Sequence, residues 1–239
     1  MPLPKISTPT YQLDLPSTGK TIKYRPFLVR EEKLLVIALE SEDTTQITTA
    51  IKDVIKNCIQ SRGVEVETLP TFDIEFLFLN IRAKSVGEEI EVNVICPDDE
   101  ITTVPITINV DDIQVQKDEA HTNKIKLDDS LMMEMKYPSL DQFIKSNFDF
   151  TDGNQMEQSF DLISSCVDKI YNEEEAWDAS DVTKSEIIEF LEQMNSSQFK
   201  EIEKFFETMP KLAHTIKVKN PNTKITSSVT LEGLSSFFA

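Results

Sequence analysis

The sequence has few of the residues on which recognisable active sites depend. Its 239 residues include five glycines, two histidines, one tryptophan and three cysteines. Five dispersed glycines cannot form a phosphate-binding loop, which needs several glycines at fixed spacing. The widely separated cysteines predict no disulfide framework. Only His121 and His214 could serve as histidine bases or ligands, and we expect a structural or surface role for both.

Long hydrophobic runs and excess basic charge are also missing. No apolar run approaches the roughly 18 residues needed to span a bilayer, and we expect no signal peptide at the N-terminus. Lys and Arg number 24 against 42 Asp and Glu, which gives a net charge of −18. Because such a surface repels phosphate backbones and anionic lipid, the sequence predicts no nucleic-acid binding and no membrane insertion. We therefore expect a reduced, folded, intracellular protein.

The first part of the chain mixes strand and helix patterns. Alternation of apolar and polar residues predicts β-hairpins, and apolar spacings of three and four predict helices. The expected hairpins lie within residues 10–29, 91–112 and 123–139, and the expected helices lie within residues 30–43, within residues 43–62 and after Pro70.

Local signals refine some of these helices. Asp43 with Gln46, and Thr183 with Glu186, have the spacing of a capping box at a helix start. Cys58 lies on the apolar stripe of the helix within residues 43–62, where a thiol usually packs in the core.

The second part of the chain is predominantly helical in pattern. A seam at spacings of four and three predicts one helix that contains Met156, Phe160, Ile163, Val167 and Ile170. Trp177 falls in an acidic connector, and Ser196 or Ser197 is expected to cap the next helix. A strand, a Pro-Asn turn, a second strand and a short apolar helix are expected at the C-terminal end.

These patterns predict an α+β fold with two domains. Residues 1–137 would form a mixed α+β domain with hairpins. Residues 138–239 would form a mainly helical domain that ends in a hairpin and a short helix.

The hairpin over residues 91–112 raises the question of a metal site. Its outline resembles one arm of a zinc ribbon, but Cys96 is followed by Pro97, Asp98 and Asp99 rather than by a second cysteine. A structural zinc site usually needs four Cys or His ligands in paired knuckles. We therefore expect no metal and no cofactor, and a degenerate zinc-ribbon-like binding module stays as an alternative.

The acidic pairs give no specific catalytic or calcium signature. Asp98–Asp99, Asp111–Asp112 and Asp128–Asp129 lack the glycine-centred spacing of a calcium loop. A hydrolase with two converging carboxylates stays open, because a sequence with 42 acidic residues does not exclude one.

Three segments, in order along nearly the whole chain, resemble a known family. They are STGKTIKYRPFLVREEKLLVIALES, LPTFDIEFLFLNIRAKSVGEEIEVNVICPDDE and TLEGLSSFF. Together they resemble the baseplate hub subunit and hub-assembly proteins of T-even-type contractile-tailed bacteriophages. Family members often carry fuller cysteine knuckles in the hairpins, and this sequence departs from them there.

The resemblance implies a non-enzymatic role in baseplate hub assembly through contacts with other phage tail or hub proteins, within an oligomeric assembly. The protein would act in the host cytoplasm, either as a hub subunit retained in the virion tail or as a chaperone-like factor that leaves. Contact roles are expected for exposed residues of the family-like segments: Tyr24, Arg25, Phe27, Arg30, Arg82, Phe237 and Phe238.

Overall fold

The structure is a computed structural model that describes residues 6–142 and 155–237. The chain divides into two compact units, of which the first comprises Met1–Gln116 with Lys211–Ala239 and the second comprises Lys117–Pro210. The second unit is therefore an insertion in the first. This division differs from the predicted boundary between residues 137 and 138, because the C-terminal hairpin pairs with a strand that precedes the insertion.

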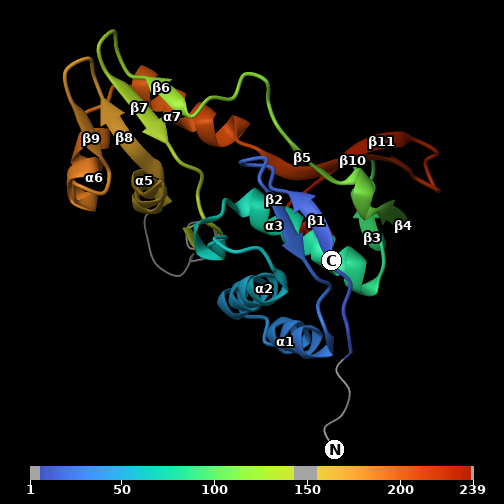
Figure 1. The fold of residues 1–239 in the computed structure, drawn as a ribbon. Coiled ribbons are helices and arrows are strands. Elements are labelled where there is room, and N and C mark those ends of the chain that lie inside the picture. Colours follow the sequence, from blue (N-terminus) through green and yellow to red (C-terminus); the bar gives the residue numbers. More distant parts are fainter. Residues whose placement is uncertain (1–5, 143–154, 238–239) are drawn as a thin grey trace, which may run out of the picture. The chain divides into compact units, whose positions relative to one another are not determined.

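The N-terminal part of the first unit carries a small hairpin and three α-helices. Its elements are β1 (Tyr11–Asp14), β2 (Thr21–Tyr24), α1 (Val29–Glu40), α2 (Thr44–Cys58), the 3-10 helix η1 (Val66–Thr68) and α3 (Thr71–Val86). Asp43 begins α2 by accepting hydrogen bonds from the backbone N–H groups of Thr45 and Gln46, as the sequence predicted. Figure 1 shows α2 lying between α1 and α3, so α1 is the outermost of the three helices.

Two longer hairpins complete the first unit. The elements are β3 (Glu89–Ile95), β4 (Thr103–Asn109), the 3-10 helix η2 (Val110–Asp112), β5 (Gln114–Gln116), β10 (Lys211–Lys219), β11 (Thr226–Glu232) and the 3-10 helix η3 (Leu234–Phe237). β3 pairs with β4, and β10 lies between β11 and β5 in an antiparallel sheet. One face of each hairpin packs on α3 and η3, in a core that includes Leu79, Val92, Leu212, Ile216 and Phe237.

In the part of the second unit that the structure describes in full, the helices α5, α6 and α7 accompany a four-stranded antiparallel sheet. Its elements are β6 (Lys124–Lys126), β7 (Met132–Met135), α5 (Gln155–Cys166), β8 (Val167–Tyr171), β9 (Ala176–Asp178), α6 (Lys184–Glu192) and α7 (Ser196–Thr208). The strand order is β6-β7-β8-β9. Met133, Met135, Ile163, Ile202 and Phe205 are fully or almost fully buried in its own core.

The predicted α+β class is confirmed, and three local predictions for the second unit are wrong. Val167 and Ile170 do not continue the helix, because α5 ends at Cys166 and β8 then pairs with β7. Trp177 lies in β9 rather than in a connector. Asn195, not Ser196 or Ser197, caps α7 by accepting from two backbone N–H groups. Within residues 6–142 and 155–237, no helix is long and apolar enough to cross a bilayer.

Candidate protein-interaction site

Helix α1 exposes an unusual number of large apolar side chains. Of its residues, only Glu31 and Ala38 are buried. The apolar residues that face solvent are Leu28 at the N-cap, followed by Val29, Leu34, Val36, Ile37 and Leu39. Val29 is 79% exposed and Leu39 is 58% exposed. A helix that is apolar on most of its faces is normally covered by other protein, so these six residues, here called the α1 surface, are a candidate contact site.

A groove between α1 and α2 adjoins this surface. Leu34, Ile37 and Ala38 form one wall, and α2 contributes Thr45, Gln46, Thr49, Ala50 and Asp53 to the other. Its cavity volume is about 290 Å³. Apolar groups on one wall and mostly polar groups on the other are compatible with contact to a protein segment.

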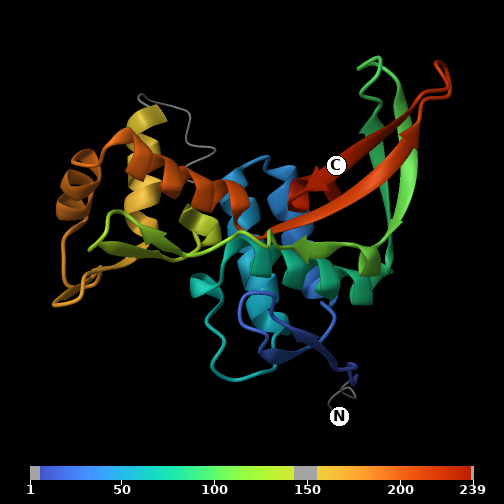
Figure 2. The same cartoon turned by 90° about the horizontal axis from the view of Figure 1, so that it is seen from above.

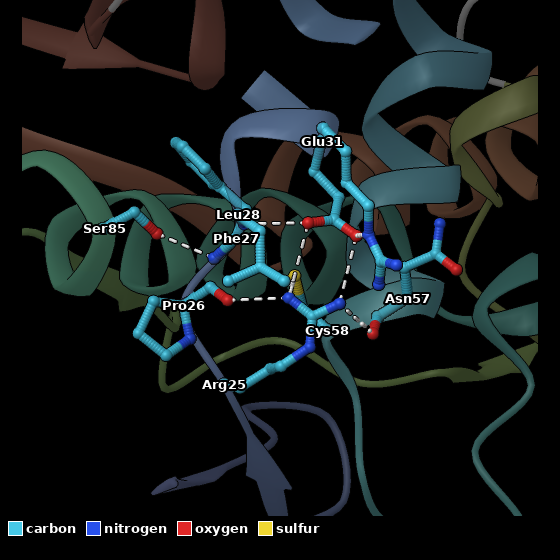
Figure 3. Close-up of polar contacts among 9 residues, drawn as sticks. Arg25, Pro26, Phe27, Leu28, Glu31, Asn57, Cys58 and Ser85 are labelled. Carbon is cyan, nitrogen blue, oxygen red and sulfur yellow. Dashed lines mark hydrogen bonds and ion pairs between the residues drawn. The ribbon is translucent and has the colours of Figure 1, made fainter. Parts of the chain in front are cut away.

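The base of α1 is fixed by a buried ion pair. Figure 3 shows Arg25, which follows β2, reaching Glu31 in the first turn of α1. The Arg25 guanidinium donates to Glu31 Oε1 at 3.0 Å and to the carbonyls of Pro26 and Asn57 at 2.8 and 3.0 Å. Both partners are buried, at 8% and 1% exposure. The network therefore joins the N-terminal hairpin, α1 and α2.

Further donors complete the environment of Glu31. The backbone N–H of Leu28 donates to Glu31 Oε2 at 2.7 Å, and Arg30 Nε donates to Oε1 at 2.7 Å. Burial alone would raise the pKa of Glu31, but the hydrogen bonds from Arg25, Arg30 and Leu28 outweigh it and lower the pKa to about 2. Glu31 is consequently a permanent anion at neutral pH.

Cys58 lies at the edge of the same network. Its thiol is fully buried, and Arg25 approaches the sulfur at 3.7 Å. Burial raises the pKa of Cys58 to about 11 despite the nearby guanidinium. The prediction of a core thiol is confirmed, and this sulfur is not an activated nucleophile.

The seven predicted contact residues differ in how far they are exposed to solvent. Tyr24, Arg25 and Phe237 are buried, so the expectation that they are exposed is wrong: Tyr24 and Phe237 pack inside the first unit, and Arg25 is the buried partner of Glu31. Phe27 and Arg82 are half-buried, and the Arg30 side chain is 70% exposed. Phe238 lies outside the described residues. Near the C-terminal end of α3, Lys84 forms an ion pair with Glu88.

The prediction missed the apolar residues of α1, although the sequence contained a signal for them. Residues 34–39 read LLVIAL, six consecutive apolar residues within a helix. A helix with one buried face needs apolar residues only at spacings of three and four. The additional apolar residues in such a run lie on further faces of the helix, and the structure shows that these faces of α1 are exposed.

Side-chain hydrogen bonds join the tips of the two long hairpins. Asn220 Nδ2, fully buried, donates to both oxygens of Asp98 at 3.1 Å and to Asp99 Oδ2 at 2.8 Å. Figure 2 shows both hairpins extending toward the same end of the first unit. Hydrogen bonds from Thr102 and Asn220 hold the pKa of Asp99 well below its usual range. Among the described residues, no three Cys, His, Asp or Glu side chains are grouped as metal ligands.

The two histidines have different settings. A structural or surface role was predicted for both, and His121 has structural contacts: its ring nitrogens lie 2.9 Å from Thr208 Oγ1 and 3.0 Å from Tyr137 Oη, and the ring packs against Phe205. Burial lowers its pKa. His214 lies in β10, close to where the sequence predicted a strand.

Comparison with known families decides the class of protein. A family model described as "T4 bacteriophage base plate protein" matches residues 8–239, which is nearly the whole chain. The chain belongs to this family. It is a T4-type phage baseplate protein, as the sequence resemblance predicted, and the family implies interaction with other phage baseplate proteins. No curated protein and no solved structure matches it significantly.

Membership of the baseplate family gives the α1 surface a natural context. A baseplate protein has other protein subunits as neighbours, and an exposed apolar helix needs such a neighbour to cover it. The family-like segment KYRPFLVREEK has two parts with different roles. Arg25 and Glu31 fix the helix from inside, whereas Leu28 and Val29 belong to the exposed surface.

Proposed function

We propose that this baseplate protein acts without catalysis in the assembly of the baseplate hub, by binding another hub protein through the α1 surface and the adjoining α1–α2 groove. The observation that carries the proposal is the exposure of apolar residues along α1, at a helix whose base is rigidly anchored. Preorganisation of this kind reduces the entropy lost on binding. The occupant is a hub protein with a complementary apolar face.

The absence of an activated group at this site supports a binding role. Cys58 is protonated and buried, and Glu31 is bound by donors on both oxygens. The reactive groups that nucleophilic or acid–base catalysis needs are therefore not presented at the α1 surface.

Exchange of three α1 residues for glutamine tests the proposal. Val29, Val36 and Leu39 are each about half exposed or more, so Val29→Gln, Val36→Gln and Leu39→Gln should leave folding intact. Burying a Val or Leu side chain contributes about 1.5–3 kcal/mol. We therefore expect the triple variant to lose at least about 100-fold in affinity for co-expressed hub proteins, measured by co-purification and then by titration of the isolated partner.

A matched control removes apolar area elsewhere in the first unit. Val86, Ile95 and Ile225 are exposed to a similar degree but lie outside α1. Their triple exchange for glutamine should leave binding unchanged. If both triple variants bind equally well, or if both lose binding equally, the α1 surface is not the contact site.

Mass spectrometry of purified particles distinguishes the two forms of the proposed role. A retained hub subunit is present in every mature tail. A transient assembly factor is found with hub intermediates in infected cells and is missing from finished particles.

A further inference from the structure

The second unit contains an apolar pocket that the proposed function does not use. Its cavity volume is about 330 Å³, which falls at the lower end of the range for ligand-binding pockets. All of its lining residues but Glu186 are apolar: Leu131, Val167, Ile170, Trp177, Ala179, Val182, Ile187 and Phe190.

Strand pairing and a helix cap determine the shape of this pocket. Ile170 in β8 and Trp177 in β9 are cross-strand partners, so their side chains lie on one face of the sheet. Ile187 and Phe190 are three residues apart on α6 and complete the wall from the helix. Trp177 is 40% exposed, which places an aromatic ring where the pocket meets solvent.

The only charged lining residue is already bound within the chain. The backbone N–H and the hydroxyl of Thr183 both donate to Glu186 Oε2 at 2.7 Å, and Thr183 in turn accepts from the Glu186 backbone N–H. This capping box fixes the start of α6. The inside of the pocket therefore selects for apolar groups, and charge selection comes from the surrounding surface.

The surrounding surface is strongly acidic. Residues 167–192, which include most of the lining, contain nine acidic residues and two lysines. Lys169 is paired with Asp178 at 3.2 Å, and Lys184 is paired with Asp161 at 2.8 Å. Glu173, Glu174 and Glu175 are all exposed in the turn between β8 and β9. The whole insertion has 22 acidic residues, nine lysines and no arginine.

Charge decides among the possible occupants. A second copy of this unit would bring equal negative charge to the rim, which is repulsive, and a fatty acid or another anionic amphiphile meets the same repulsion. A lysine- or arginine-containing segment gains from both the apolar pocket and the acidic rim. We propose that this pocket binds a basic segment of a partner protein, with one large apolar side chain inserted beside Trp177. The proposal concerns the second unit and does not depend on the α1 surface.

The single tryptophan allows a direct test on the full-length protein. Trp177 is the only source of tryptophan emission. The probe is a short synthetic peptide with a central phenylalanine flanked by lysines and serines, and without tryptophan. Insertion of the phenylalanine displaces water from the indole, so we expect a saturable blue shift of the emission that weakens with added salt. A peptide with serine at the centre, and one with glutamates instead of lysines, should each bind at least about tenfold more weakly.

Charge variants test whether the acidic residues around the pocket, rather than the overall negative charge of the protein, strengthen peptide binding. Glu173→Gln, Glu174→Gln and Glu175→Gln together should weaken binding of the lysine–phenylalanine peptide about tenfold. The matched control exchanges Glu201, Glu203 and Glu207 on α7 for glutamine. This variant loses the same amount of charge at exposed residues that do not line the pocket, and its affinity should change less than about twofold.

Three results would overturn the proposal. The first is equal binding of the serine-centred or the glutamate peptide. The second is equal weakening by the rim and α7 variants. The third is a saturable tryptophan response to toluene without any response to the lysine–phenylalanine peptide, which would assign the pocket to small neutral ligands. A failure of the α1 variants described above changes none of these readouts.

Discussion

The Arg25 guanidinium lies 3.0 Å from the buried carboxylate of Glu31, and this contact joins the N-terminal hairpin to the first turn of α1. Because of this contact, the segment from Arg25 to Glu31 contains both buried residues that fix the helix and residues exposed at the surface. With the two charges paired inside, the intervening Leu28 and Val29 are held at the surface.

Loss of Arg25 should therefore be far more costly than loss of Arg30. Both residues bind Glu31 Oε1, but the Arg25 side chain is 10% exposed and that of Arg30 is 70% exposed. Arg25→Met leaves a buried carboxylate without its main partner, and we expect the free energy of unfolding to fall by about 3–5 kcal/mol. Arg30→Met should cost at most about 1 kcal/mol. Urea unfolding monitored by circular dichroism measures both, and equal losses would contradict the assigned roles.

Acid should destabilise the first unit through Glu31. Its pKa is about 2 in the folded protein against an ordinary value of 4.5. A lowered folded pKa gives a stabilisation that is complete above the unfolded pKa and is lost as the pH falls from about 5 to about 2. The difference corresponds to about 3 kcal/mol. Glu31→Gln should remove this component of the pH dependence, and an unchanged acid profile in that variant would refute the assignment.

Glu75 should give a pH dependence of opposite sign. Burial raises the pKa of Glu75 to about 7, and the hydrogen bond from the Leu234 backbone N–H at 3.2 Å only partly opposes this rise. A raised folded pKa gives a stabilisation that is complete below pH 4.5 and is lost as the pH rises through about 7. Glu75→Gln, which keeps an acceptor for Leu234, should therefore be more stable than the parent at pH 8 by on the order of 2 kcal/mol. A variant that is less stable at pH 8 would exclude this explanation.

Asn220 should be critical to the contact between the two hairpin tips. Its amide serves Asp98 and Asp99 together, and its side-chain oxygen accepts from the backbone N–H of Asn222 at 2.8 Å. Asn220→Ala leaves the Asp98 and Asp99 carboxylates without this buried donor and the Asn222 N–H without its acceptor. We expect the free energy of unfolding to fall by about 2–3 kcal/mol. Asn222→Ala, at an exposed residue of the same turn, should cost less than about 1 kcal/mol. Thermal melting of the two variants under one buffer condition provides the comparison.

The first unit should fold after removal of the insertion. Lys211 pairs with Gln116, so a short Gly-Ser linker can replace residues 117–210 without changing the β5–β10 pairing. This deletion should retain a cooperative unfolding transition. A fragment of residues 1–137 should not, because it loses the core contributions of Leu212, Ile216 and Phe237. The reverse outcome would favour the boundary predicted from the sequence.

Local patterns in the sequence predicted much of the fold, and long-range pairing explains what they missed. Asp43 and Thr183 cap their helices as expected, because a cap depends on residues only three positions apart. Val167 and Ile170 fit a helical seam equally well, and only the pairing of β8 with β7 makes them a strand. The division into two units differs from the predicted boundary for the same reason, since β10 pairs with β5 across an entire inserted unit.

Prediction of the candidate site was limited by a different cause. The motif around Arg25 was recognised correctly, but a charged residue in a motif is equally compatible with a buried ion pair and with a surface contact. Burial of Arg25 requires both the Glu31 carboxylate and the carbonyl of Asn57, 32 residues away in sequence. The apolar run within α1, by contrast, is a local signal that the prediction missed, and only the structure shows that its residues are exposed.

The adjacency of Gln116 and Lys211 on neighbouring strands has a consequence for the length of the insertion. The chain leaves the first unit and re-enters it at a single point of one ladder, so the first unit constrains only the distance between the two ends of the inserted segment. We expect that an insert of another length or sequence, with ends equally close together, would fit the same framework.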